Sequence, residues 1–268
     1  MESPRTAIAA KEEGDEFARR RGLEGAAGWN RSELVWMMFD LGQWDELIEL
    51  ADERIAWARE GGRFQTTTMV LTYKAIVLAL RGLLTDAAAL RDEFLPAARE
   101  AADPQVLVPA LTAAALIEEG SGNVPAALAL VGEVELATRD RADWTRLLHA
   151  PICLRISVAA DALSVGEPLL DRPDARGARL EHALVAGRAI VAEARGEIGE
   201  AGRLYAAAAE RWDQYEFRFE QAHALLGHWR CTGDDQSLRR ANELFARLGA
   251  VVPQKTAEDP LRAARRAR

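Results

Sequence analysis

The stretch SELVWMMFDLGQWDELIELADERIAWAREGG, residues 32–62, decides the fold of this protein. Ser32 can cap a helix, and the run that follows up to Leu41 is apolar around most of its circumference. Gly42 can adopt the left-handed conformation that ends a helix. Apolar residues at three- and four-residue spacing then continue to the closing glycine pair and form one stripe of a second helix. The short connection therefore predicts an antiparallel helical hairpin.

The composition predicts an all-α chain. Of the 268 residues 49% are hydrophobic, and alanine and leucine, the best apolar helix formers, dominate this set. β-branched runs bounded by turn signals, which would indicate strands, are missing from the sequence. The formal net charge of -8 argues against nucleic acid as the main partner.

The hairpin design recurs along the chain. Gly42, Gly82 and Gly122 are 40 residues apart, and Gly196 and Gly233 are 37 apart. A period in this range with two helices per unit predicts an α-solenoid of about six units, each burying its open face on its neighbours. The alternative is one irregular helical domain. The predicted repeat domain covers residues 1–252, with approximate units 32–62, 63–102, 104–138, 141–176, 177–213 and 216–248, and a charged, frayed tail follows at 253–268.

Four further local expectations concern the connections. Residues 7–21 are expected to form a first helix, and the glycine-rich residues 22–28 a connection. Pro151 is expected to kink or split a long helix over 141–163, because proline lacks the backbone N–H that an interior helical position requires. Residues 164–176, which contain two prolines, are expected to form a shortened second helix.

Several enzyme classes and a membrane location are excluded by the motifs. None of the lysines follows a glycine, so the chain has no P-loop, and it has neither an HExxH nor a G-x-S-x-G motif. The N-terminus lacks the apolar core of a signal peptide, and the longest apolar run, residues 106–117, is too short to cross a membrane. The two cysteines form no disulfide framework, which favours a reduced, cytoplasmic protein.

Two histidine–cysteine pairs are the candidate metal ligands. His149 and Cys153 are four residues apart, and His228 and Cys231 are three apart, so each pair can share a helix face. Free cysteine is more commonly a small buried apolar group, and this interpretation is favoured. The sequence therefore predicts no metal and no cofactor.

Two carboxylate pairs are the candidate acid–base groups. They are Glu118 with Glu119, and Glu197 with Glu200. Both pairs flank glycine turns, where solvated charge is usual, so no catalytic residue is predicted.

The tryptophans are concentrated near the N-terminus, at Trp29, Trp36, Trp44 and Trp57. They could line a groove for a peptide or an apolar ligand. Core packing between the first two units is the favoured alternative.

The layout is similar to tetratricopeptide repeats, although the units are longer than 34 residues and lack the strict closing proline. Three phrases resemble the helical-repeat tails of bacterial nucleotide-cyclase, STAND-ATPase or LuxR-type signalling regulators: LGQWDEL (41–47), ARGEIGEAGRLYAAAAERW (194–212) and AHALLGHWRCTGDDQSLRRANELFARLGA (222–250). The resemblance implies a regulatory tail that senses or relays a signal through protein or small-molecule contacts. It also implies that catalysis resides in other domains.

These observations predict a non-enzymatic interaction or signal-sensing scaffold with a TPR-like right-handed superhelix. A protein or peptide would bind in a concave groove lined by the first helix of each unit. The alternatives are a small-molecule sensor with an apolar pocket inside the superhelix, an enzyme with an unfamiliar helical fold, and a structural spacer or oligomer-forming segment. The candidate partner-binding residues are Trp36, Phe39, Arg63, Tyr73, Arg146 and His149.

Overall fold

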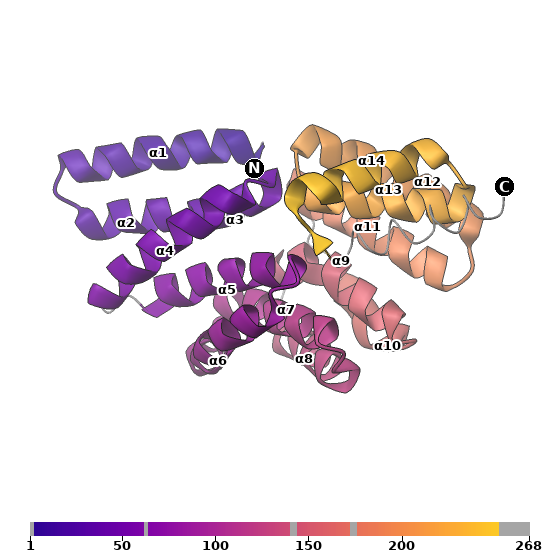
Figure 1. The fold of residues 1–268 in the computed structure, drawn as a ribbon, viewed down its shortest axis with the longest axis horizontal. Helices are drawn as coiled ribbons and strands as arrows, with labels where there is room; N and C mark the ends of the chain where they lie inside the picture. Colours follow the sequence, from indigo (N-terminus) through magenta and orange to yellow (C-terminus); the bar gives the residue numbers. More distant parts are fainter. Residues whose placement is uncertain (1–2, 62–63, 140–143, 172–175, 252–268) are drawn as a thin grey trace.

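The computed structural model describes residues 3–61, 64–139, 144–171 and 176–251, and within these ranges it is helical without any strand (Figure 1). The predicted all-α class is therefore confirmed for the described part of the chain. The elements are α1 (Pro4–Arg20), α2 (Glu24–Ser32), α3 (Leu34–Leu41), α4 (Trp44–Glu60), α5 (Phe64–Leu80), α6 (Leu84–Ala101), α7 (Pro104–Gly120), α8 (Val124–Thr138), α9 (Trp144–Ala159), α10 (Leu163–Gly166), the 3-10 helix η1 (Glu167–Leu170), α11 (Ala178–Ala194), α12 (Ile198–Tyr215), α13 (Arg218–Thr232) and α14 (Asp235–Leu248).

The turns between paired helices share one backbone motif. The five predicted turn glycines, Gly42, Gly82, Gly122, Gly196 and Gly233, have φ values between 74° and 79°. At the Gly42 turn the N–H of Gln43 donates to the carbonyl oxygen of Met38 at 2.9 Å, the bond that closes a Schellman cap. Asp161, with φ of 53°, occupies the corresponding turn between α9 and α10, where Ala162 donates to Ser157. The glycine spacing of the sequence does not mark this turn, because an aspartate replaces the glycine.

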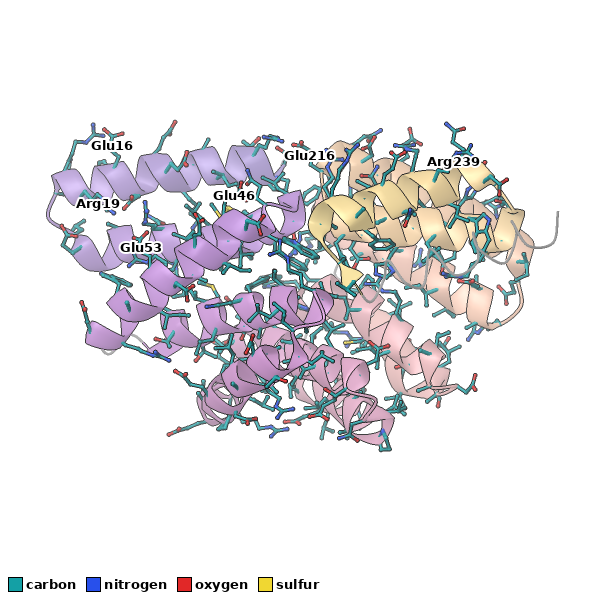
Figure 2. The ribbon with its side chains drawn as sticks, viewed as in Figure 1. Glu16, Arg19, Glu46, Glu53, Glu216 and Arg239 are labelled. Carbon is teal, nitrogen blue, oxygen red and sulfur yellow. The ribbon has the colours of Figure 1, made fainter. Side chains whose placement is uncertain are left out.

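A ladder of charges on the outside follows the 40-residue period. Arg59 binds Glu93 at 2.6 Å, and the same pair shifted by 40 residues, Arg99 with Glu133, also lies at 2.6 Å. Arg19 and Glu53 occupy the corresponding positions one period earlier (Figure 2), where they bind Asp15 and Arg31 instead of each other. The repeat seen in the turns is therefore also present in side-chain contacts.

Helices pack on their neighbours in the sequence, and α5, α7, α9 and α11 also pack on one another in that order. The two ends of this array meet, because α3 contacts α13 (Figure 1). Arg5 binds Glu216 at 2.9 Å, and Glu216 lies where the N-terminal and C-terminal helices face each other (Figure 2). Side chains from both ends of the chain consequently meet on the inner side of the array.

Two expectations near the N-terminus are wrong. Residues 22–28 are not only a connection, because α2 begins at Glu24 and includes Gly28. A Cβ atom on Gly28 would lie 2.0 Å from the ring of Trp57, so the glycine permits close packing of α2 on α4. Ser32 does not cap α3. It ends α2, and its buried hydroxyl donates to the carbonyl oxygen of Gly28 at 2.8 Å.

The remaining local expectations have mixed outcomes. The first helix is confirmed as α1. Of the shortened element expected over 164–176, α10 and η1 account for the part up to Leu170, and residues 172–175 lie outside the described residues. Pro151 does not split its helix, because α9 continues through it, and α9 ends at Ala159, before the predicted end at residue 163. The tail 253–268 lies outside the described residues. Within the described ranges, no helix has both the length and the apolar character that a membrane crossing requires.

Candidate functional site

A buried ion pair lies at the centre of the inner side. Nη2 and Nε of Arg179, on α11, lie 2.9 and 2.8 Å from the two carboxylate oxygens of Asp40, on α3. Asp40 is 0% exposed, and burial raises its pKa to about 6, a rise that the Arg179 guanidinium limits. This pair joins the N-terminal helices to the C-terminal helices.

Aromatic rings surround the ion pair. The ring of Phe39 is stacked on Trp44 with centroids 5.7 Å apart, and it meets Phe217 at 5.7 Å and Tyr73 at 5.9 Å. The Arg179 guanidinium lies 5.5 Å from the Phe217 ring. We call Phe39, Asp40, Tyr73, Arg179 and Phe217 the central plug. Tyr73 and Arg179 of the plug line one cavity, and the Phe39 ring lies 6.1 Å from that of Phe219, which lines a second cavity.

The aromatic cavity has a volume of about 550 Å³. It lies at the N-terminal ends of α7, α9 and α11 and also receives side chains from α2, α3 and α5. Two tryptophans at its mouth are partly open to solvent, Trp29 at 38% and Trp144 at 45%. The lining side chains that matter most to its chemistry are Trp29, Trp36, Tyr73, Trp144, His149 and Arg179.

His149 is the neutral polar group of the aromatic cavity. Burial lowers its pKa to about 3, and the nearby positive charge of Arg179 adds to this shift. The imidazole is therefore uncharged at neutral pH. Its Nδ1 atom has no hydrogen-bond partner among the described residues. A neutral imidazole has one donor and one acceptor nitrogen, so His149 can offer either to a ligand.

The other charged groups around this cavity are already satisfied. Glu33 is paired with Lys11. Asp103 accepts a hydrogen bond from the backbone N–H of Gln105 at 3.0 Å and thereby caps α7. The cavity is thus lined by aromatic surface with few polar groups left to bind a ligand.

No protein-family model and no curated protein matches this sequence. The function is therefore inferred from the geometry of the cavities.

The structure brings together three of the six predicted partner-binding residues. Trp36, Tyr73 and His149 all line the aromatic cavity. Phe39 is 3% exposed and belongs to the central plug. Arg146 is buried elsewhere, where its guanidinium donates to backbone carbonyl oxygens of Pro168, Leu169 and Asp171 at 2.6 to 3.1 Å. Arg63 lies outside the described residues.

The two interpretations of the four tryptophans, core packing and the lining of a ligand site, each hold for two of them. Trp44 is buried, and its Nε1 donates to the carbonyl oxygen of Phe39 at 3.2 Å. Trp57 packs under the Arg54 guanidinium, 4.1 Å from the ring centroid. Trp29 and Trp36 face the aromatic cavity instead. All four tryptophans lie within residues 29–57, and their spacing in the sequence does not distinguish a ring in the core from a ring that lines a cavity.

The members of the two histidine–cysteine pairs have different surroundings, because His149 lines the aromatic cavity whereas Cys153 lies in a packed core. Cys153 is buried, with Sγ 3.8 Å from the hydroxyl of Thr112. The Nδ1 of His228 lies 3.0 Å from the hydroxyl of Ser237. Among the described residues, no three His, Cys, Asp or Glu side chains are grouped so that they could hold a metal ion.

Sequence reasoning missed Arg179 and Trp144 as site residues. Arg179 follows a proline-rich stretch, and no periodic signal marks it as buried. Trp144 falls within the long helix predicted over 141–163, and nothing in its local sequence distinguishes it from a core residue. Their convergence depends on contacts between units far apart in the chain, which local spacing does not report.

Proposed function

We propose that this chain is a helical-repeat sensor module that binds a small molecule with an aromatic or apolar body in the aromatic cavity. The observation that carries the proposal is the cavity itself. Its volume of about 550 Å³ falls within the range of small-molecule sites, and three tryptophans line it. Two of them are partly exposed, and exposed aromatic surface at a cavity mouth favours a bound ligand.

The polar groups suggest how such a ligand is oriented. The N-terminal ends of α7, α9 and α11 lie at this cavity, and helix N-termini carry partial positive charge. This field favours a ligand whose polar end accepts hydrogen bonds. His149 supplies a further polar contact, because its Nδ1 is unsatisfied within the described structure.

The sensor role and the repeat type belong to the same proposal. The 40-residue ladder of charges and the stacking of α5, α7, α9 and α11 support a TPR-like solenoid. The resemblance to the helical tails of bacterial signalling regulators supports a non-enzymatic, signal-relaying role. A protein or peptide in the concave groove stays a prediction. The central plug occupies that face at Phe39 and Tyr73, which favours the small-molecule alternative.

A fluorescence titration with 1-anilinonaphthalene-8-sulfonate, an aromatic anion, tests this proposal on the full chain. We expect saturable binding with one probe per chain. Val106→Trp places a large ring in the aromatic cavity and should weaken binding at least tenfold. The matched control is Leu136→Trp on α8, where the side chain is 65% exposed, and it should bind as the parent does.

Far-UV circular dichroism should show that both variants retain their helices. Equal affinity of the parent and Val106→Trp would show that the probe does not bind in the aromatic cavity. A panel of small aromatic compounds can then be ranked by the rise in melting temperature. A ligand at about 100 times its Kd stabilises the folded state by about 2.7 kcal/mol.

A further inference from the structure

The second cavity lies on the other side of the central plug, where four helices end. Its volume is about 440 Å³. The last residues of α5, α7, α9 and α11, which are Leu80, Gly120, Ala159 and Ala194, all line it. Helix C-termini carry partial negative charge from their unsatisfied carbonyl groups. Four such ends converging on one space produce a field that favours a cation.

The two guanidinium groups at this cavity are already paired. Arg155 donates to both carboxylate oxygens of Glu220, at 2.8 and 2.7 Å. Arg230 donates to both oxygens of Glu193, at 2.5 and 2.7 Å, and the hydroxyl of Tyr205 donates to Glu193 at 2.6 Å. Each guanidinium is therefore engaged by its own carboxylate, and each of the two bidentate pairs is electrically neutral.

Glu119, near the end of α7, is the carboxylate left over. Glu119 lines the cavity, and its carboxylate oxygens have no hydrogen bond or ion pair with any described residue. Burial raises its pKa, an effect that the positive charge of Arg155 partly offsets. We call the space lined by Glu119, Arg155, Glu193, Tyr205, His223 and Arg230 the acidic cavity.

His223 does not neutralise this carboxylate. Burial lowers its pKa well below the usual value, and Arg155 and Arg230 add to the effect, so the imidazole is uncharged. Its ring is instead packed edge-on against Phe219, with centroids 4.6 Å apart. The acidic cavity, counted with Glu220, thus holds three carboxylates and two guanidinium groups, an excess of one negative charge.

Apart from the Phe219 ring, the rest of the cavity wall is aliphatic. Leu116, Ile156 and Leu226 lie among its lining residues. A ligand that complements both features carries one positive charge at one end and an aliphatic body at the other. We propose that the acidic cavity is a second binding site, for a small primary aliphatic amine whose ammonium group binds Glu119. An ammonium offers three donors and a full positive charge, which suit a carboxylate placed among the partially negative ends of helices.

Isothermal titration calorimetry of the full chain with hexylamine at neutral pH tests this proposal. Hexan-1-ol and hexanoate are probes of the same length without the positive charge. We expect saturable binding of hexylamine, at least tenfold weaker binding of hexan-1-ol, and no binding of hexanoate. Equal affinity for the amine and the alcohol would overturn the proposal, because binding would then depend on the aliphatic body alone.

Glu119→Gln should weaken hexylamine binding at least tenfold. The matched control is Glu118→Gln, which removes the same charge from the neighbouring residue. The Glu118 carboxylate is bound by Arg91 and Asn123 and does not line the cavity, so the control should retain the parent affinity. Unchanged affinity in Glu119→Gln would show that the carboxylate does not hold the amine.

A second variant keeps the test independent of that carboxylate. Ala159→Trp places a ring at the mouth of the acidic cavity, and it should also abolish hexylamine binding. Val106→Trp, on the other side of the plug, should leave hexylamine binding unchanged. The two proposals can therefore fail separately. The aromatic cavity can fail to bind its probe while the acidic cavity still binds the amine, and the reverse can also occur.

Discussion

The two cavities are built from opposite ends of the same helices, and they differ in charge for that reason. α7, α9 and α11 present their N-termini to the aromatic cavity and their C-termini to the acidic cavity. Because these helices run in the same direction, their dipoles add rather than cancel. One end of the array therefore favours electron-rich ligand groups, and the other end favours cations.

The side chains strengthen this difference. At the aromatic cavity, Glu33 and Asp103 are both satisfied, and three tryptophans line the wall. At the acidic cavity, Glu119 is left without a partner among the described residues. A stack of parallel helices can therefore form two sites of opposite charge preference when a plug of side chains divides its inner side.

The largest expected effect comes from breaking the plug that separates the cavities. Asp40→Ala leaves the buried Arg179 guanidinium without its carboxylate and should lower the free energy of unfolding by about 3–5 kcal/mol. Urea denaturation measures the change. Glu93→Ala, which removes the exposed partner of Arg59, should cost no more than about 1 kcal/mol. Similar losses in the two variants would mean that the plug does not hold the two ends of the chain together.

Overpacking one wall should affect only one cavity. A Cβ atom on Gly227 would lie 2.4 Å from the ring of Tyr205, which lines the acidic cavity. Gly227→Ala should therefore destabilise the fold by about 1–3 kcal/mol, since a closely packed ring must move. Thermal denaturation gives the loss of stability, and calorimetry should show weaker hexylamine binding. The aromatic-cavity probe should bind as before, and a loss at both cavities would contradict their independence.

The neutral histidine of the aromatic cavity should make the fold sensitive to acid. The folded pKa of His149 is about 3, far below the unfolded value of about 6.5, so below pH 6.5 the unfolded state takes up a proton that the folded state does not. Between pH 7 and pH 5 this group alone should remove about 2 kcal/mol of stability. His149→Gln should show a correspondingly smaller loss in urea titrations at pH 7 and pH 5. An identical pH dependence in the variant would place the effect on other groups.

The sequence predicted the elements of this structure better than its sites. Helix pairs and left-handed turns are local features, so the glycines at positions 42, 82 and 122 marked them correctly. The failures at residues 22–28 and at Ser32 come from packing of Gly28 on Trp57, a contact between separate helices. The same limit explains the site. Trp36, Tyr73 and His149 were selected from first-helix positions, whereas Arg179 became visible only when the two ends of the chain met.

Glu119 illustrates this limit and gives the smallest expected effect. From the sequence it was half of a carboxylate pair beside a glycine turn, where solvated charge is usual. The structure separates the pair, because Glu118 is bound by Arg91 and Asn123 whereas Glu119 faces the acidic cavity. Burial raises the pKa of Glu119, so its charged form is less stable in the folded chain than in water. The associated loss of stability is present at neutral pH and is relieved as the pH falls through the folded pKa.

Glu119→Gln removes this charge while keeping the shape of the side chain. It should raise the free energy of unfolding at pH 7 by about 0.5–1 kcal/mol, the usual gain from removing an unfavourable charge. Glu118→Gln should lower stability instead, because it breaks two contacts. Differential scanning calorimetry of both variants measures the two shifts. A gain in stability with a simultaneous loss of amine binding is typical of a residue kept for function rather than for folding, since a binding site is stabilised only when its ligand is present. A loss of stability in Glu119→Gln would instead assign this carboxylate to the fold.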